Sequence, residues 1–493
     1  MNPEANVPAT EPAAEAAAPA HRQGWLPWAV VGALALAIRL SRLDRFSYWL
    51  DEVLEVFTIR SSWGAMWRTL REQVLNPPLD YVLQKAFDAF GPSDAARRIL
   101  PAVWGAACVV IFGLLIGRRA SPRVGLLTAF CLAFAPFHVR YSQEVRPYSL
   151  GLFLTALVLL LIDRYLERPS GLRLVAVLAG AVAVAYTMFL AALVLLIAGG
   201  SLILDDALTE SAPRRQSARL LLMWSPALIV IIAASYSPWL PLVWRSMGSP
   251  PFSPPPVFAV RRIGRLFSYF GFGFHDWYPL GLRGAFFIAL VVGGAALALR
   301  KYRLRFLLVW AVLGIAAIEA LEERHGVFDS IFHFLPAGIA LTVLATLPIG
   351  WLAERRSGAV LASVILAMVV FLDARALAFY FRKGRADWRP AAAFLRAQPR
   401  DAVILTAGPY VQLCLGYYVN GPDWLCCPGP KDRQILDVGY DAAGLLTAWQ
   451  PSRSAWLVTP LGAKLTPEDR LRDISGTTFP TAEMGVLVRR LGP

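Results

Sequence analysis

Apolar segments separated by short polar loops occupy most of the chain. A helix needs roughly 20 apolar residues to cross a hydrocarbon core of about 30 Å. The stretch 172–204 is too long for one such helix and short for two, and we divide it near AYTMF, at residues 185–189. The pattern predicts a polytopic α-helical membrane domain over residues 25–378. Its expected spans, about eleven, are 25–43, 98–117, 124–139, 149–166, 172–187, 189–204, 220–240, 283–299, 306–320, 331–351 and 359–378.

The loops between these spans are basic on one side only. Arginines collect at 117–123, 300–305 and 353–358, and Lys/Arg-rich short loops are typical of the cytoplasmic side. An odd number of spans then places the N-terminus in the cytoplasm and the C-terminus outside. We expect a multi-pass protein of the cell (inner) membrane, with its C-terminal part extracytoplasmic or periplasmic.

The two ends of the chain differ from its middle. Residues 1–24 are rich in Ala, Pro and Glu without an apolar core, which predicts a disordered cytoplasmic tail. Alternating patterns predict a small α/β domain at 379–493, with a helix starting at Asp387, strands at 402–407, 455–460 and 485–490, and a helix at 467–474. Cys414 could pair with Cys426 or Cys427 in an oxidising compartment. All three could equally be free thiols.

Composition supports the membrane assignment. The chain is 57% hydrophobic and 17% charged, against about a quarter charged in soluble domains. Its net charge of +14 would suggest nucleic acid as a partner in a soluble protein. Because the arginines lie between spans, we attribute the charge to membrane topology and expect no nucleic-acid partner.

Two long outer loops, 44–97 and 241–282, hold much of the remaining polar sequence. The first contains an amphipathic stretch of a kind that often lies flat on a membrane surface. It starts with Asp51, Glu52 and Glu55. In a helix Asp51 and Glu55 share a face, whereas Glu52 points about 100° away from Asp51. The alternative is an acidic helix start that only the helix dipole stabilises.

Two further outer segments carry candidate chemistry. Pro77 and Pro78 predict a rigid turn, after which a helix would carry Asp80, Tyr81 and Lys85 outward. The short loop at 137–150 is dense in polar side chains, namely His138, Arg140, Tyr141, Gln143, Glu144, Arg146 and Tyr148. Glu144 could simply be neutralised by a neighbouring arginine. Carboxylates beside arginines also suit a phosphate to hold and a proton to remove, because the planar guanidinium donates two hydrogen bonds at once.

Four motifs in this order resemble a known group of enzymes. They are LDE after the first span, NPPLDYVL in the first outer loop, RYSQEVRPYSLGLF before the fourth span and ADWRPAAAFLRA after the last. Together they resemble the GT-C type membrane glycosyltransferases, near the ArnT-like and protein O-mannosyltransferase-like enzymes. This resemblance covers residues 25–420. It implies transfer of a sugar from a polyprenyl-phosphate donor on the outer face to a lipid, glycan or protein hydroxyl, with inversion.

The resemblance also implies roles for individual residues. Asp51 would be the general base, Glu52 would orient it or the acceptor, and Glu144 would bind sugar hydroxyls or the acceptor. The remaining candidates are Arg140, Arg146 and Lys85 for the donor phosphate, and Tyr141, Tyr148, Asn76 and His333 for other substrate contacts. This chemistry requires no cofactor and no metal, and no compact ligand set stands out, although a divalent metal is not excluded.

The chain departs from the family pattern at three places. Asn76 stands where several relatives have Lys, Thr187 and Met188 where many have Thr-His, and His333 and Phe334 where Arg-Tyr is common. A relative that binds a polyprenyl phosphate without catalysis is therefore one alternative. A transporter is another, although transporters usually place polar groups at mid-bilayer and show paired halves.

Overall fold

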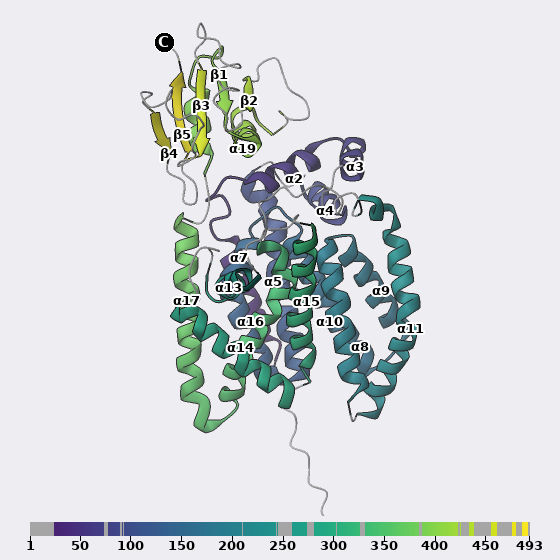
Figure 1. The fold of residues 1–493 in the computed structure, drawn as a ribbon. Helices are drawn as coiled ribbons and strands as arrows, with labels where there is room; N and C mark the ends of the chain where they lie inside the picture. The colour runs from purple at the N-terminus through teal and green to yellow at the C-terminus, as the bar shows by residue number, and fades with distance from the viewer. Residues whose placement is uncertain are drawn as a thin grey trace, which may run out of the picture.

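The structure is a computed structural model of the whole chain. It describes residues 24–72, 77–88, 91, 93–209, 211–242, 244, 259–273, 281–301, 303–325, 331–383, 387–422, 424, 433–437, 455–460, 476–479 and 486–491. Three parts follow each other along one axis: a helical bundle, a layer of short helices, and a small α/β domain (Figure 1).

Each expected span coincides with a helix in the described residues, which confirms the helical membrane fold. Seven segments are long and apolar enough to cross a membrane by length and composition, and α1, α6 and α9 are shorter apolar helices. The bundle helices are α1 Leu26–Leu40, α5 Asp94–Arg119, α6 Pro122–Phe134, α8 Tyr148–Glu167, α9 Gly171–Ala185, α10 Phe189–Ala207, α11 Ala212–Tyr236, α14 Leu282–Arg300, α15 Arg305–His325, α16 Leu335–Ala353 and α17 Ala359–Lys383.

The ambiguous stretch 172–204 is divided where the sequence predicts. Helix α9 ends at Ala185 and α10 begins at Phe189. The carbonyl of Tyr186, in the break between them, accepts a hydrogen bond of 2.9 Å from the amide of Leu79. The break therefore also anchors the layer of short helices to the bundle.

Small residues allow the bundle helices to approach closely. A Cβ built on Gly294 of α14 would lie 1.9 Å from the carbonyl oxygen of Leu344 in α16, and one on Gly125 of α6 would lie 2.3 Å from that of Gly113 in α5. Membrane helices associate by packing and not by the hydrophobic effect, so such contacts favour glycine.

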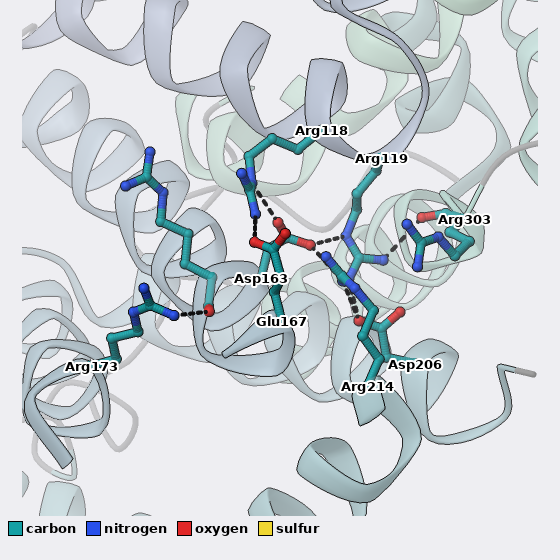
Figure 2. Close-up of polar contacts among 9 residues, drawn as sticks. Arg118, Arg119, Asp163, Glu167, Arg173, Asp206, Arg214 and Arg303 are labelled. Atoms are coloured by element: carbon teal, nitrogen blue, oxygen red, sulfur yellow. Dashed lines mark hydrogen bonds and ion pairs between the residues drawn. The ribbon is translucent and has the colours of Figure 1, made fainter. Parts of the chain in front are cut away.

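A buried charge cluster joins the ends of four bundle helices (Figure 2). These helix ends lie at the pole of the bundle opposite the α/β domain (Figure 1). Asp163 of α8 accepts from Arg118 at 2.8 Å and from Arg119 and Arg214 at 3.0 Å. Asp206 of α10 accepts from Arg119 at 2.7 Å and from Arg214 at 2.9 Å. The ends of α5, α8, α10 and α11 are thereby fixed to one another.

The outer layer consists of α2 Leu50–Arg60, α3 Trp63–Glu72 and α4 Leu79–Phe87. It lies between the bundle and the α/β domain (Figure 1). Within the second outer loop, α13 Ala259–Phe270 packs against α14 and α16. The short helix α7 Pro136–Tyr141 and the 3-10 helix η3 Ile331–Phe334 complete this side of the bundle.

The α/β domain has a five-stranded mixed sheet of order β2-β1-β3-β5-β4. The parallel pairs are β1 with β2 and β1 with β3, and β5 is antiparallel to β3 and β4. The three expected strands appear as β1 Val403–Thr406, β3 Ala455–Pro460 and β5 Val486–Leu491, and the first expected helix appears as α18 Arg389–Arg396. Three further elements were not predicted from the sequence: α19 Pro409–Asn420, β2 Ile435–Asp437 and β4 Gly476–Phe479. The helix expected at 467–474 lies outside the described residues.

One apolar core joins the outer layer to the α/β domain. It contains Tyr48, Val53 and Leu70 from the outer side of the membrane domain, and Leu415 and Val458 from the α/β domain. The hydroxyl of Tyr418 accepts from the amide of Tyr48 at 2.7 Å and donates to Asp94 Oδ2 at 2.6 Å. The two parts therefore pack as one body at this interface. Cys414 is a buried free thiol in the same core, and Cys426 and Cys427 lie outside the described residues.

Candidate active site

The three acids of the first outer loop lie on the first two turns of α2 and have different environments. Asp51 is 25% exposed, whereas the side chains of Glu52 and Glu55 are fully buried. Asp51 and Glu55 share a helix face, and Glu52 points elsewhere, as the helical spacing predicts. The same short sequence thus supplies one accessible carboxylate and two enclosed ones.

Glu52 is held in a structural network. Arg98 of α5 donates from Nε to Oε1 at 2.9 Å and from Nη2 to Oε2 at 2.8 Å. The amide of Val145 donates to Oε1 at 2.9 Å. Arg98 also donates to the carbonyls of Leu43 and Phe46. Glu52 therefore ties α2 to the start of α5 and to the loop before α8.

Asp51 and Glu55 share one guanidinium. Arg146 Nη2 lies 3.7 Å from Asp51 Oδ2, and Arg146 Nη1 lies 3.1 Å from Glu55 Oε2. The guanidinium also lies 5.6 Å from the ring centroid of Tyr148. The loop before α8 thus meets α2 at the face that carries the accessible acid.

A second carboxyl group touches Glu55. The side chain of Asp80, on α4, interacts with that of Glu55, and both are buried. Burial raises the pKa of Glu55 well above its usual 4.5, and the neighbouring Asp80 raises it further, although Arg146 acts in the opposite direction. Burial likewise raises the pKa of Asp80 above 3.8. Asp80 and Tyr81 point inward against α2, and the expectation that they point outward was wrong.

Glu144 and Arg140 form a second carboxylate–guanidinium pair one turn away. Arg140 Nε lies 3.6 Å from Glu144 Oε1, and the carboxylate is fully buried while the arginine is 20% exposed. Arg140 also lies over the ring of Tyr141 at 5.6 Å. The segment from α7 to the start of α8 therefore carries two arginines, Arg140 and Arg146, each paired with a fully buried carboxylate.

Aromatic side chains enclose these groups. Tyr141 and Tyr148 pack edge to face at 5.2 Å, and the hydroxyl of Tyr269 in α13 donates to that of Tyr141 at 3.0 Å. Phe332 of η3 lies 5.4 Å from Tyr148 and 5.9 Å from Trp49. Tyr141 and Tyr148, which the sequence predicts to contact substrate, thus lie near the acids and pack against residues of α13 and η3.

The remaining predicted residues are not all brought to this place. Lys85 donates to the carbonyls of Ile59 and Ser61, both at 2.6 Å, at the C-terminal end of α2. His333 is half-buried beside Phe332, at 4.4 Å between ring centroids. Asn76 lies outside the described residues. Lys85 is therefore a helix-capping side chain in this structure, and we leave it out of the proposed phosphate site.

The described residues contain no group of three or more His, Cys, Asp or Glu side chains that could hold a metal ion. Sequence reasoning missed two members of the site. Arg98 belongs to no motif, and the resemblance assigns no role to Glu55, whose partner Asp80 is 25 residues away in the chain. For Glu55 the available signal was its four-residue spacing from Asp51, which places both side chains on one face of a helix.

Comparison with known proteins agrees with this architecture. The family described as dolichyl-phosphate-mannose-protein mannosyltransferase matches residues 76–239. ArnT from Cupriavidus metallidurans bound to undecaprenyl phosphate superposes with a TM-score of 0.56 at 13% identity, over 96% of this chain and 100% of that one. The apo state of ArnT gives 0.54 at 15% identity, over 95% and 99%.

A more distant structure shares the fold as well. The Archaeoglobus fulgidus oligosaccharyltransferase in complex with Zn and sulfate superposes with a TM-score of 0.52 at 11% identity, over 93% of this chain and 72% of that one. No curated protein matches the chain in sequence. The chain therefore has the fold of the GT-C type membrane glycosyltransferases. The resemblance seen in its sequence motifs, to the ArnT-like and protein O-mannosyltransferase-like enzymes, is confirmed.

Proposed function

We propose that the protein is an integral-membrane glycosyltransferase. It moves a sugar from a polyprenyl-phosphate donor to a hydroxyl of an envelope glycolipid, glycan or protein on the outer face of the membrane. The observation that carries the proposal is the partly exposed Asp51, the one acid of α2 that is not buried, 3.7 Å from Arg146. The similarity to ArnT, which binds undecaprenyl phosphate, supports a lipid-phosphate donor.

In the proposed reaction Asp51 takes the proton of the acceptor hydroxyl as its oxygen attacks the anomeric carbon. The bond to the phosphate oxygen breaks on the opposite side of the sugar, so the anomeric centre inverts without a covalent enzyme intermediate. The leaving phosphate needs charge stabilisation and not protonation. Arg146 and Arg140 supply it, because guanidinium groups beside the leaving phosphate stabilise its developing negative charge. Glu144 and the two tyrosines, Tyr141 and Tyr148, contact the sugar or the acceptor, and His333 and Asn76 are further candidates.

The test is transfer from polyprenyl-phosphate sugars in membranes that contain the wild type or a variant. Removing a general base costs typically 10²–10⁴-fold, so Asp51→Asn is expected to lower transfer by about that factor at normal protein levels. Glu144→Gln should lower it as well. Asp44→Asn, an exposed acid close by, is the matched control and should transfer normally.

Undiminished transfer by Asp51→Asn would overturn the assignment of the base. If the wild type moves no sugar from any plausible donor while a solute crosses the bilayer, the transporter hypothesis replaces the enzyme. Binding of a polyprenyl phosphate without any transfer would instead indicate the non-catalytic relative.

The orientation belongs to the same proposal. We assign the pole with the arginine cluster to the cytoplasmic side. The catalytic domain, residues 25–378, then spans the inner membrane, and residues 379–493 lie outside the cytoplasm. A reporter that is active only outside the cytoplasm, fused after residue 493, should be active. Activity of the same reporter fused in the loop at 353–358 would contradict this orientation.

A further inference from the structure

More carboxyl groups than guanidinium groups surround Arg146 in the candidate site, and an anion that binds there must overcome their negative charge. Asp51 and Glu55 both contact Arg146, and Asp80 interacts with Glu55. The bound donor would add another negative charge at Arg146. This inference rests on the proposed function, since it concerns how the lipid phosphate binds.

Few groups in the described part of the chain could offset that charge. Those that face Glu55 are Asp51 on its own helix, Asp80 and Tyr81 on α4, and Arg146. From α3 the ionisable side chains are exposed, and α19 contributes the ring of Tyr417 against Phe57 together with the thiol of Cys414. Lys85 on α4 is directed to the carbonyls of Ile59 and Ser61. Arg146 is the cation of this cluster.

The carboxyl pair itself is built to hold a proton. Glu55 Oε1 and Asp80 Oδ2 are buried and receive no hydrogen bond from the described residues. Buried polar atoms are normally hydrogen-bonded, and a proton taken up by the pair would satisfy both atoms at once. The raised pKa values of Glu55 and Asp80 have the same physical cause, burial.

We propose that the donor phosphate binds at Arg146 together with a proton that the Glu55–Asp80 pair takes up from solvent. When the guanidinium turns to the phosphate, Glu55 loses its cation. Without proton uptake the enclosed cluster would gain a full negative charge in a medium of low dielectric constant. With it, one carboxylate becomes a neutral acid, and the net charge of the site stays the same.

The direction of the pH dependence follows from this coupling. Below the pKa of the pair in the free protein the proton is already bound, and the donor binds tightly. Between that pKa and the higher pKa of the pair in the donor-bound state, the donor binds about tenfold more weakly for each pH unit, because one proton must be taken up per donor bound. The KM for the donor therefore rises with pH. The kcat at saturating donor does not depend on the protonation of Glu55 and Asp80. Glu55 and Asp80 are positioning residues that act through Arg146.

The experiment measures protons bound with the ligand. The probe is farnesyl methyl phosphate, a phosphodiester with a single charge that does not itself titrate near neutral pH. The probe is titrated into the purified full-length protein in detergent, and the binding enthalpy is measured by calorimetry in buffers of different ionisation enthalpy. The slope of the binding enthalpy against the buffer enthalpy gives the number of protons taken up. We expect up to one proton per probe for the wild type, and none for Glu55→Gln/Asp80→Asn.

The controls separate the possible outcomes. Asp44→Asn should take up protons as the wild type does. Each single variant, Glu55→Gln and Asp80→Asn, should take up fewer, and serves if the double variant does not fold. Equal uptake by the wild type and the double variant, or no uptake by the wild type between pH 6 and 9, would overturn the proposal.

Failure of the coupling and failure of the proposed function give different results. If Arg146→Ala binds the probe as the wild type does, or the wild type does not bind it, then Arg146 does not hold the phosphate and both proposals lose their basis. If transfer occurs with normal dependence on Asp51 but without proton uptake, only the coupling is wrong.

Discussion

Asp51 and Glu52 are neighbours on α2, yet the helix turns their side chains into unlike surroundings. Glu52 receives two hydrogen bonds from Arg98 and one from the amide of Val145. A carboxylate bound in this way has little freedom to collect a proton from a substrate. Asp51 has a longer contact with Arg146 and is partly exposed to solvent, which is why the proposal assigns the base to Asp51 and not to Glu52.

The first prediction concerns Glu52. In Glu52→Gln the buried Arg98 keeps its carbonyl partners but loses its counter-ion, and breaking a buried pair costs about 3–5 kcal/mol. We expect a clear fall in the midpoint of thermal unfolding of the purified protein. Glu72→Gln, an exposed acid on α3, is the control and should unfold as the wild type does. An unchanged midpoint with lost transfer would instead support a role of Glu52 in orienting the base or the acceptor.

Sequence reasoning selected the residues of the candidate site more readily than their partners. Asp51, Glu144, Arg140 and Arg146 stand out in the sequence because ionisable groups beside apolar spans are rare and costly, and their roles stay predictions. The pairing of Arg146 with both acids was not, because it depends on how the loop before α8 approaches α2. Lys85 looked like a phosphate ligand by charge alone, and only the structure shows that helix carbonyls bind it.

At the level of helices, the arginine-rich loops do more than set orientation. Asp163 and Asp206 are fully buried and accept hydrogen bonds from arginines of other helices (Figure 2). Several charges in one network satisfy each other better than an isolated pair does. The basic loops that the sequence suggests for topology therefore also fix the ends of four helices.

The second prediction tests this network. Asp163→Asn weakens the contacts with Arg118, Arg119 and Arg214 at once, and we expect a loss of about 3–5 kcal/mol, as for other buried pairs. Glu167→Gln is the matched control, since its side chain is 48% exposed and pairs with Arg118 alone. An exposed pair contributes about 0–1 kcal/mol. Similar unfolding midpoints for the two variants would contradict the structural role of the cluster.

The spans were predictable because the thickness of the bilayer imposes a length on every apolar helix. No such constraint acts on the α/β domain, and its short elements were less visible. Helix α19 begins after Gly408, which has a φ of +92°, and its sequence PYVQLCLGYYVN is rich in the β-branched and aromatic residues that favour strands. Packing against α18 and α2 overrides that local preference.

At the level of the whole molecule, the α/β domain packs directly on the layer that carries the candidate active site. Tyr418 bridges the amide of Tyr48 and the carboxylate of Asp94. Tyr417 packs edge to face on Tyr48 and Phe57. These contacts fix Tyr48, three residues before the proposed base, and Phe57 within α2, so the position of Asp51 depends on the docked domain.

The third prediction follows from this contact. Tyr418→Phe leaves the amide of Tyr48 without its acceptor, which costs about 1–3 kcal/mol for a buried group. We expect faster limited proteolysis of the α/β domain and reduced transfer at equal protein level. Tyr165→Phe, on α8 at the opposite pole, is the control. Unchanged proteolysis and transfer in Tyr418→Phe would show that the domain does not position α2.

The core that joins these parts has a consequence for how the protein is made. Its early members, such as Tyr48 and Val53, emerge from the ribosome hundreds of residues before late members such as Leu415 and Val458. The layer of α2, α3 and α4 is therefore made long before the α/β domain that covers it, and its apolar surface stays uncovered until then. A nascent chain that stops after α17 would contain the bundle helices and still lack the α/β half of this core.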